Sequence, residues 1–148
     1  MTPALQAFPN RDALMQAAAE RLAAALSAGL EQRGAACAAL SGGSTPGPAY
    51  ERLAAMSLDW PWVTFALVDE RCVPASDPAS NGGLLRRALA PALAHGARLL
   101  PMRADAATEA LYNALHIDIA LMGMGADGHT ASWFPGGDAL HAALHPNS

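Results

Sequence analysis

Apolar and polar residues alternate along the chain in segments that suit helices and strands in turn. Long segments with apolar positions three and four residues apart predict helices, whereas short apolar runs rich in branched side chains predict strands. Asn10 is the expected N-cap of the first helix, and Gly34 is expected to end it. We expect helices over residues 11–32, 46–56, 81–94, 104–115 and 139–144, and strands over residues 35–40, 63–68, 98–102 and 117–122. This alternation predicts a single α/β domain over residues 1–148, in which helices cover a mostly parallel sheet.

The composition fits a soluble α/β protein and narrows its chemistry. The formal net charge is −4, and all nine basic residues are arginines. Because the sequence has no lysine, Schiff-base chemistry and a P-loop lysine are excluded within it. No basic surface indicates nucleic-acid binding, and no apolar segment is long enough to cross a membrane. Since no secretory signal precedes its two cysteines, Cys37 and Cys72, we expect a cytoplasmic protein.

Three of the predicted strands are followed by loops that carry reactive or ligand-binding residue types. These loops cover residues 41–46, 69–74 and 123–130. The carboxyl ends of parallel strands meet at one edge of a sheet, which is where ligands of α/β sheets usually bind. The sequence therefore predicts that the three loops converge on one site.

The first loop, SGGSTP, has two interpretations. Gly42 and Gly43 allow backbone N–H groups to approach an anion, and Ser44 or Thr45 can cap the helix that follows. Free N–H groups and the positive end of a helix dipole together predict a phosphate site. The alternative is an ordinary strand-to-helix turn with a conventional cap.

The second loop places Asp69, Glu70 and Arg71 at the end of a strand. Arg71 can bind a phosphate or carboxylate through two parallel hydrogen bonds, and Asp69 or Glu70 can orient it or accept hydrogen bonds from sugar hydroxyls. The alternative is a local salt-bridged cluster. Asp77 and Asn81 are either a turn acid and a helix cap or residues that line the pocket.

The third loop follows what we expect to be a buried parallel strand, and it contains GMGADGHT. Its glycines match the G-x-G-x-x-G dinucleotide pattern, but no acidic residue follows at the distance that a dinucleotide site requires. The glycines, which include Gly125, fit another role better than dinucleotide binding: they let the backbone approach a ligand or an oxyanion closely.

His129 is the side chain of this loop that is best suited to transfer a proton near neutral pH, and Asp127 is near enough in sequence to orient it. A metal site is not expected, because no second histidine or cysteine stands at ligand spacing from His129. The serines lack the G-x-S-x-G elbow of serine hydrolases, so covalent serine catalysis has little support.

Taken together, LSGGSTP, VDERCVP with the following SNGGLLRR, and DIALMGMGADGHTASWFPG resemble the 6-phosphogluconolactonase family. The resemblance covers about residues 37–136. The related glucosamine-6-phosphate deaminases share the sheet and a G-x-G-x-D-G-H loop, but they carry D-E-Y at residues 69–71 and I-A-F-N-E-P after the histidine. Arg71 and the Thr130–Ser132 continuation therefore favour the lactonase.

The resemblance implies a three-layer α/β/α sandwich similar to the deaminases and ribose-5-phosphate isomerase. It implies hydrolysis of 6-phosphoglucono-δ-lactone in the oxidative pentose phosphate pathway, with no metal and no organic cofactor. The implied catalytic residues are His129, as the base that deprotonates water, Asp127 and Arg71. The implied substrate-binding residues are Gly42, Gly43, Ser44, Thr45, Asp69, Asn81 and Gly125.

The sequence departs from the family pattern at three points. Members of the family are longer and have further strands and a lysine near the phosphate after the D-G-H-T block. We therefore expect either that residues 1–148 lack the C-terminal strands or that residues are missing inside this range. The segment 102–117 is short for the family, and Trp133 stands where leucine is common. Two alternatives stay open: an amino-sugar phosphate isomerase or deaminase, and a phosphosugar-binding module without catalysis.

Overall fold

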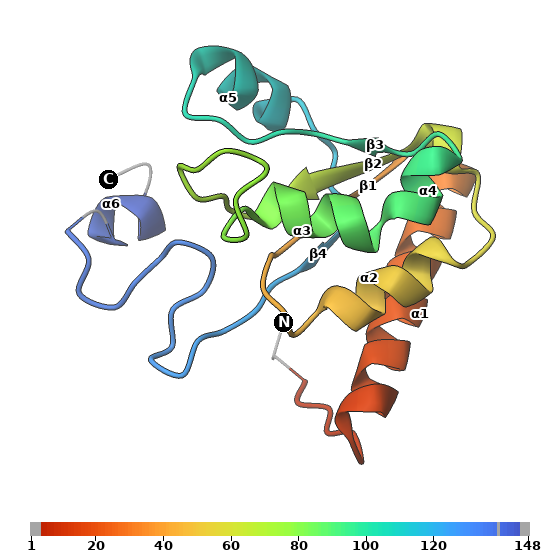
Figure 1. Cartoon of the computed structure of the whole chain (residues 1–148), viewed down its shortest axis with the longest axis horizontal. Helices are drawn as coiled ribbons and strands as arrows, with labels where there is room; N and C mark the ends of the chain where they lie inside the picture. Colours follow the sequence, from red (N-terminus) through yellow and green to blue (C-terminus); the bar gives the residue numbers. More distant parts are fainter. Residues whose placement is uncertain (1–3, 139, 146–148) are drawn as a thin grey trace.

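A computed structural model describes residues 4–138 and 140–145, which form an α/β fold (Figure 1). The elements in chain order are α1 (Arg11–Arg33), β1 (Ala36–Leu40), α2 (Gly47–Ala54), the short 3₁₀ helix η1 (Trp60–Trp62), β2 (Val63–Leu67), α3 (Asn81–Ala88), α4 (Ala90–Ala94), β3 (Arg98–Leu99), α5 (Ala106–Asn113), β4 (Ile119–Leu121) and α6 (Leu140–Leu144). Across the described residues, no helix has both the length and the apolar character that a membrane crossing needs.

The four strands form one sheet in the order β3-β2-β1-β4, and every neighbouring pair is parallel. Leu40 at the end of β1 is in register with Leu67 at the end of β2 and with Leu121 at the end of β4. The three strands therefore end side by side, and the loops that follow them leave the sheet at the same edge, on the left in Figure 1. The predicted parallel sheet is confirmed.

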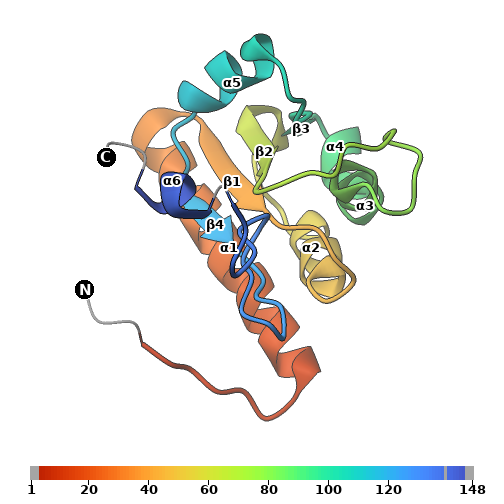
Figure 2. The same ribbon diagram turned by 90° about the vertical axis from the view of Figure 1, so that its left-hand side faces the viewer.

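Alternate residues of β1 face two different layers. Ala36, Ala38 and Leu40 join the main core with buried side chains of α1, α2, α3 and α4, whereas Cys37 and Ala39 face Tyr112 and Leu115 in and after α5. Four helices thus cover one face of the sheet, and α5 lies on the other (Figure 2). The α/β/α layering is present, with the second helical layer provided by α5.

The first helix forms as its terminal residues predict. The Asn10 side chain accepts a hydrogen bond from the Ala13 amide at 2.8 Å, and Gly34 ends the helix in the left-handed conformation with φ of 72°. Its amide donates to the Leu30 carbonyl, which is the usual way that a glycine closes a helix.

Two predicted elements are wrong in extent, and proline explains both. The helix expected over residues 81–94 is two helices, because Pro91 lacks the N–H that would continue α3 and its ring conflicts with the preceding turn. The strand expected over residues 98–102 is only Arg98–Leu99, since Pro101 cannot donate to the ladder. Apart from η1, which the sequence did not predict, the other described elements lie within about two residues of their predicted bounds, and Ala139 lies outside the described residues.

The prediction that the segment 117–122 is a buried strand is also wrong. Only Ile119–Leu121 forms a strand, and its residues are partly or fully exposed. Ile117 and Met122 on either side keep 46% and 48% of their surface exposed. The reason is position: β4 pairs with β1 alone among the described strands and therefore forms an edge of the sheet.

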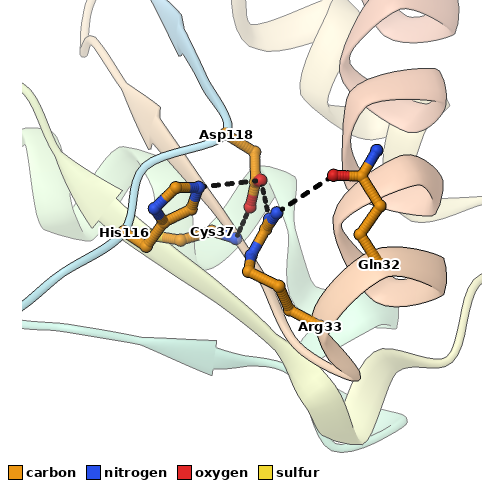
Figure 3. A network of polar contacts seen from close by, with 5 residues as sticks. All are labelled: Gln32, Arg33, Cys37, His116 and Asp118. Atoms are coloured by element: carbon orange, nitrogen blue, oxygen red, sulfur yellow. Dashed lines mark hydrogen bonds and ion pairs between the residues drawn. The ribbon is translucent and has the colours of Figure 1, made fainter.

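Asp118 fastens the start of β4 at the end of the sheet opposite the three loops. Its carboxylate accepts a hydrogen bond from the Cys37 amide at 2.8 Å and pairs with Arg33 at the end of α1 (Figure 3). His116 lies 3.7 Å from the same carboxylate. Gly29 leaves room for this pair, because a Cβ there would lie 2.8 Å from Arg33 Nη2 and 2.9 Å from Asp118 Cγ. The network fixes α1, β1 and β4 relative to one another.

Candidate active site

A cavity of about 820 Å³ opens at the carboxyl edge of the sheet, a size that suits a small-molecule ligand. All three loops contribute to its wall, so the predicted convergence is confirmed. The predicted site residues that line the cavity are Gly42, Gly43, Ser44, Thr45, Asp69, Arg71, Asn81, Gly125 and His129. Asp127 is outside this wall and contacts His129 instead.

His129 is held from two sides. Its Nδ1 lies 2.6 Å from the Asp127 Oδ1, and Phe134 stacks on the imidazole with ring centroids 4.8 Å apart. The hydrogen bond from the His129 side chain lowers the pKa of Asp127, so the carboxylate is ionised at neutral pH. A carboxylate at Nδ1 favours the tautomer with the proton on that atom, which leaves the lone pair on Nε2. Neutral His129 is thereby prepared to accept a proton at Nε2.

Gly125 provides the space for the imidazole. A Cβ at this position would lie 2.6 Å from the Asp127 Oδ1 and would overlap the His129 Nδ1 and Cε1. The Gly125 amide also donates to the His129 carbonyl at 2.8 Å. The sequence predicted that this glycine lets a ligand approach the backbone, whereas in the structure the histidine ring itself occupies the space beside it.

The glycines of the first loop serve two different purposes. Gly42 has no room for a side chain because Asn81 packs against it, and a Cβ there would lie 2.8 Å from the Asn81 Cβ. Gly43 adopts φ of 93°, a left-handed conformation that favours glycine, and has open space around it. The two glycines thus allow the loop to turn sharply beside α3.

The amides of this loop are free to bind an anion. The N–H groups of Gly42–Thr45 donate no hydrogen bond to any described residue. The prediction that Ser44 or Thr45 caps the next helix is wrong, because Pro46 is the N-cap of α2 and no side chain bonds to the first turn. Free amides and an uncapped helix start fit the phosphate interpretation better than the conventional cap.

Ser41 has the one buried side-chain atom without a hydrogen-bond partner among the described residues. Ser41 is 7% exposed and is among the residues that line the cavity, and its buried Oγ has no hydrogen-bond partner among the described residues. The Ser41 carbonyl, in contrast, accepts a hydrogen bond from the buried Tyr50 hydroxyl at 2.8 Å, which joins the end of β1 to α2. A buried polar atom is costly without a partner, so this hydroxyl marks an unsatisfied polar position beside the cavity.

The second loop is held by hydrogen bonds rather than by the salt-bridged cluster that was the alternative. Within the described residues, neither Asp69 nor Glu70 forms an ion pair with Arg71. Arg71 Nη1 instead donates to the Ala79 carbonyl at 2.7 Å. The remaining guanidinium N–H groups are directed to no described partner, so Arg71 can bind an anion at the cavity wall.

Glu70 fastens the second loop to the start of α3. Burial raises the pKa of Glu70, but hydrogen bonds from the amides of Arg71, Gly82 and Asn81 and from the Ser80 hydroxyl outweigh burial and leave the pKa lowered. Ser80 is the N-cap of α3, with its Oγ accepting from Gly83, so the interpretation of Asn81 as the cap is wrong.

Asn81 and Asp69 form a contact that connects the loops. Asn81 is 2% exposed, and its Nδ2 donates to the carbonyl and to the Oδ1 of Asp69 at 3.0 and 3.2 Å. The other carboxylate oxygen of Asp69 accepts from the Ser132 hydroxyl at 2.9 Å. Neither Ser132 nor Phe134 is among the site residues that the sequence predicts, although both lie in the motif that resembles the family. No local pattern reveals either contact.

The cavity continues from this polar end to an apolar one. Side chains of α1 and β4 form the second part of the wall, among them Leu14, Met15, Leu22, Ile119 and Leu121. Among the described residues, no three histidine, cysteine, aspartate or glutamate side chains are grouped as metal ligands would be. The polar end therefore combines the imidazole of His129, the guanidinium of Arg71 and the free amides of residues 42–45.

Comparison with known proteins identifies the relationship. Residues 9–146 match the family described as glucosamine-6-phosphate isomerases/6-phosphogluconolactonase. The 6-phosphogluconolactonase of Mesorhizobium japonicum is 42% identical over 96% of this chain and 64% of its own length. The one from Pseudomonas putida is 44% identical over 85% of this chain and 54% of its own length.

Solved structures agree in fold. A 6-phosphogluconolactonase from Shewanella baltica superimposes with a TM-score of 0.82 at 38% identity, covering 92% of this chain and 63% of the other. The enzyme from Trypanosoma brucei gives a TM-score of 0.75 at 27% identity, with 93% and 65% covered. The chain thus spans less than two thirds of these proteins, and by the match over residues 9–146 it belongs to the glucosamine-6-phosphate isomerase/6-phosphogluconolactonase family.

Proposed function

We propose that the chain carries the catalytic base and the phosphate-binding loop of a 6-phosphogluconolactonase, which hydrolyses 6-phosphoglucono-δ-lactone to 6-phosphogluconate in the oxidative pentose phosphate pathway. One observation carries the proposal: His129, oriented by Asp127, lines a cavity that it shares with Arg71 and the free amides of residues 42–45. The substrate is a small phosphorylated molecule in the cytoplasm, and the reaction requires no nucleic acid, membrane, metal or organic cofactor.

In the proposed reaction, His129 acts as a general base on water. Nε2 removes a proton from the water, whose oxygen forms a bond to the lactone carbonyl carbon. The tetrahedral intermediate collapses with cleavage of the ring C–O bond, and the imidazolium returns the proton to the ring oxygen, which becomes a hydroxyl. The new carboxylic acid then ionises. Asp127, whose Oδ1 lies 2.6 Å from Nδ1, stabilises the imidazolium that forms between the two steps.

The anionic groups of substrate and transition state match the remaining polar wall. The free amides of residues 42–45 stand at the start of α2, where the helix dipole favours a phosphate. Arg71 supplies a positive charge at this wall, either to the phosphate or to the oxyanion that develops on the carbonyl oxygen. Asp69 and Asn81 also line the cavity, and the hydrogen bonds between them support these loops.

A lactone is an activated ester, so one base and correct positioning are sufficient chemistry. Positioning alone is worth several orders of magnitude in rate when the reacting atoms are held in near-attack geometry. General-base assistance adds about 10²- to 10⁴-fold. The site therefore needs no covalent intermediate, which agrees with the Ser132 hydroxyl donating to a carboxylate rather than to a histidine.

The test compares His129→Ala with the wild-type chain and with His95→Ala, a matched variant of an exposed histidine at the end of α4. Hydrolysis releases one proton per lactone opened, so a pH-stat measures the rate above the spontaneous background. We expect His129→Ala to lose about 10²- to 10⁴-fold in kcat and His95→Ala to keep the wild-type rate. An unchanged rate for His129→Ala would remove the proposed base.

Two other outcomes would assign the chain to the open alternatives. Release of ammonia from glucosamine-6-phosphate, without lactone hydrolysis, would make it an amino-sugar phosphate isomerase or deaminase. Calorimetric binding of 6-phosphogluconate with no turnover of either substrate would make it a phosphosugar-binding module.

A further inference from the structure

The segment of residues 122–137, here named the histidine loop, is joined to the rest of the site by very few polar contacts. Its backbone hydrogen bonds run mostly within the loop itself, such as Gly125 to His129 and Trp133 to Thr130. Within the described part of the chain, a single hydrogen bond joins the loop to residues before 122. It is the bond at 2.9 Å from the Ser132 hydroxyl to the Asp69 carboxylate.

The acceptor of this bond is itself fixed. Asp69 receives two hydrogen bonds from the Asn81 amide, and Asn81 is buried against Gly42 of the first loop. One carboxylate oxygen of Asp69 thus points to α3 and the other to the histidine loop. The chain of contacts from Gly42 through Asn81 and Asp69 to Ser132 connects all three loops of the site.

The residue before Ser132, Ala131, has an unfavourable backbone conformation, and the contact between Ser132 and Asp69 gives a reason for it. Ala131 adopts φ of 54°, and it is the one described non-glycine residue in the left-handed region. It lies within the tight turn that Thr130 and Trp133 close, with the Trp133 amide donating to the Thr130 carbonyl at 3.0 Å. Such a conformation is unfavourable for alanine and persists where the surroundings fix it. The turn brings the Ser132 hydroxyl to Asp69.

We infer that Ser132 is a positioning residue, which holds His129 in place against the cavity by tethering the histidine loop to Asp69. The kinetic part of this inference rests on the proposed lactonase function. His129 precedes Ser132 by three residues, and Phe134, two residues after it, stacks on the imidazole. A hydrogen bond to a carboxylate is stronger than a neutral one, so one such bond can set the position of an otherwise loosely attached loop.

Loss of the tether should affect the chemical step rather than substrate binding. The amides of residues 42–45 and Arg71 belong to other loops and keep their geometry, whereas His129 moves relative to them. Displacement of a catalytic group by about 1 Å can cost about 100-fold in rate. The local pair of Asp127 and His129 remains intact, because both residues move together with the loop.

The experiment compares Ser132→Ala and Ser132→Thr in the full chain, with Ser57→Ala as a control at an exposed serine outside the cavity. Hydrogen exchange is measured over residues 123–137, and kcat and KM are measured for the lactone. We expect Ser132→Ala to exchange faster in this segment and to lose about 10- to 100-fold in kcat, with KM changed by less than about threefold. Ser132→Thr keeps the hydroxyl on an exposed side chain, so its hydrogen exchange and its kcat should stay near those of the wild type.

Each possible result decides the inference. Unchanged exchange in Ser132→Ala overturns the tether, and faster exchange with an unchanged kcat overturns the positioning role. A rise in KM with constant kcat would also overturn it, because Ser132 would then act on binding. If the wild-type chain hydrolyses no lactone, the proposed function fails, yet the exchange measurement on Ser132→Ala and Ser132→Thr still tests the tether by itself.

Discussion

The substitution Gly125→Ala tests the geometry of the site most directly. A Cβ at Gly125 would lie 2.6 Å from the Asp127 Oδ1, and the atoms of the His129 ring are closer still. Ordinary van der Waals contact requires about 3.5 Å, so the pair of side chains must move by about 1 Å or more. The backbone itself accepts alanine, because Gly125 is not among the residues with positive φ. The conflict therefore falls on the imidazole.

The expected result is a large loss of activity with little loss of stability. A displacement of about 1 Å corresponds to about 100-fold in kcat, which equals about 2.7 kcal/mol of transition-state stabilisation. The side chains of His129 and Asp127 keep 35% and 59% of their surface exposed, so moving them removes little buried area. We expect the free energy of unfolding to change by no more than about 0.5 kcal/mol, which is about 2 °C in Tm or less.

The assay combines the pH-stat rate of lactone hydrolysis with thermal unfolding followed by circular dichroism. Gly47→Ala is the matched control: a Cβ at this first residue of α2 meets no atom within 4 Å, so rate and Tm should stay near the wild type. Wild-type activity in Gly125→Ala would refute the reasoning that this glycine leaves the space in which His129, the proposed base, has to lie. A fall in Tm of many degrees would refute the reasoning that the conflict relaxes locally.

Two further predictions concern the supporting structure. Glu70→Gln should lower stability by roughly 1 kcal/mol at neutral pH, because the charge that binds the start of α3 is lost. Since the folded-state pKa of Glu70 is lowered, the stability it contributes is present above its ordinary pKa of 4.5 and is lost as the pH falls through the folded-state value. Thermal unfolding of the wild-type chain and of Glu70→Gln at a series of pH values should therefore show that their difference in stability becomes smaller in acid. A thiol-reactive disulfide reagent should modify exposed Cys72 quickly and Cys37 only on unfolding, since burial and the nearby Asp118 charge raise the pKa of Cys37 to about 11.

One outcome would contradict each of these two predictions, the one on Glu70 and the one on the cysteines. A stability difference for Glu70→Gln that stays constant or grows below pH 4.5 would show that the charge of the carboxylate does not hold α3. Two thiols that react at equal rates in the native chain would show that β1 is not buried between the two helical layers, contrary to the 5% exposure of Cys37.

Much of the fold was readable from the sequence because it depends on local signals. Asn10 and Gly34 mark the ends of α1 through bonds to residues within one turn, so the sequence contains both partners. The parallel sheet follows from the alternation of apolar runs and helical segments. Once the strands are parallel, the loops after β1, β2 and β4 have to meet at one edge, which is why the composition of the site could be predicted before its geometry.

What the sequence determined by itself is which loops meet at one edge of the sheet and which residue types they carry: an imidazole near a carboxylate, an arginine and a glycine-rich segment. Only the tertiary structure decided how they act on one another. It placed the His129 ring beside Gly125, packed Asn81 on Gly42, and joined Ser132 to Asp69 across 63 positions of sequence. These contacts depend on the conformations of loops that have no periodic pattern, and on distances between segments that only the folded sheet brings together. The exposure of β4 was not predictable either, because an apolar strand has the same sequence pattern at the centre of a sheet and at its edge.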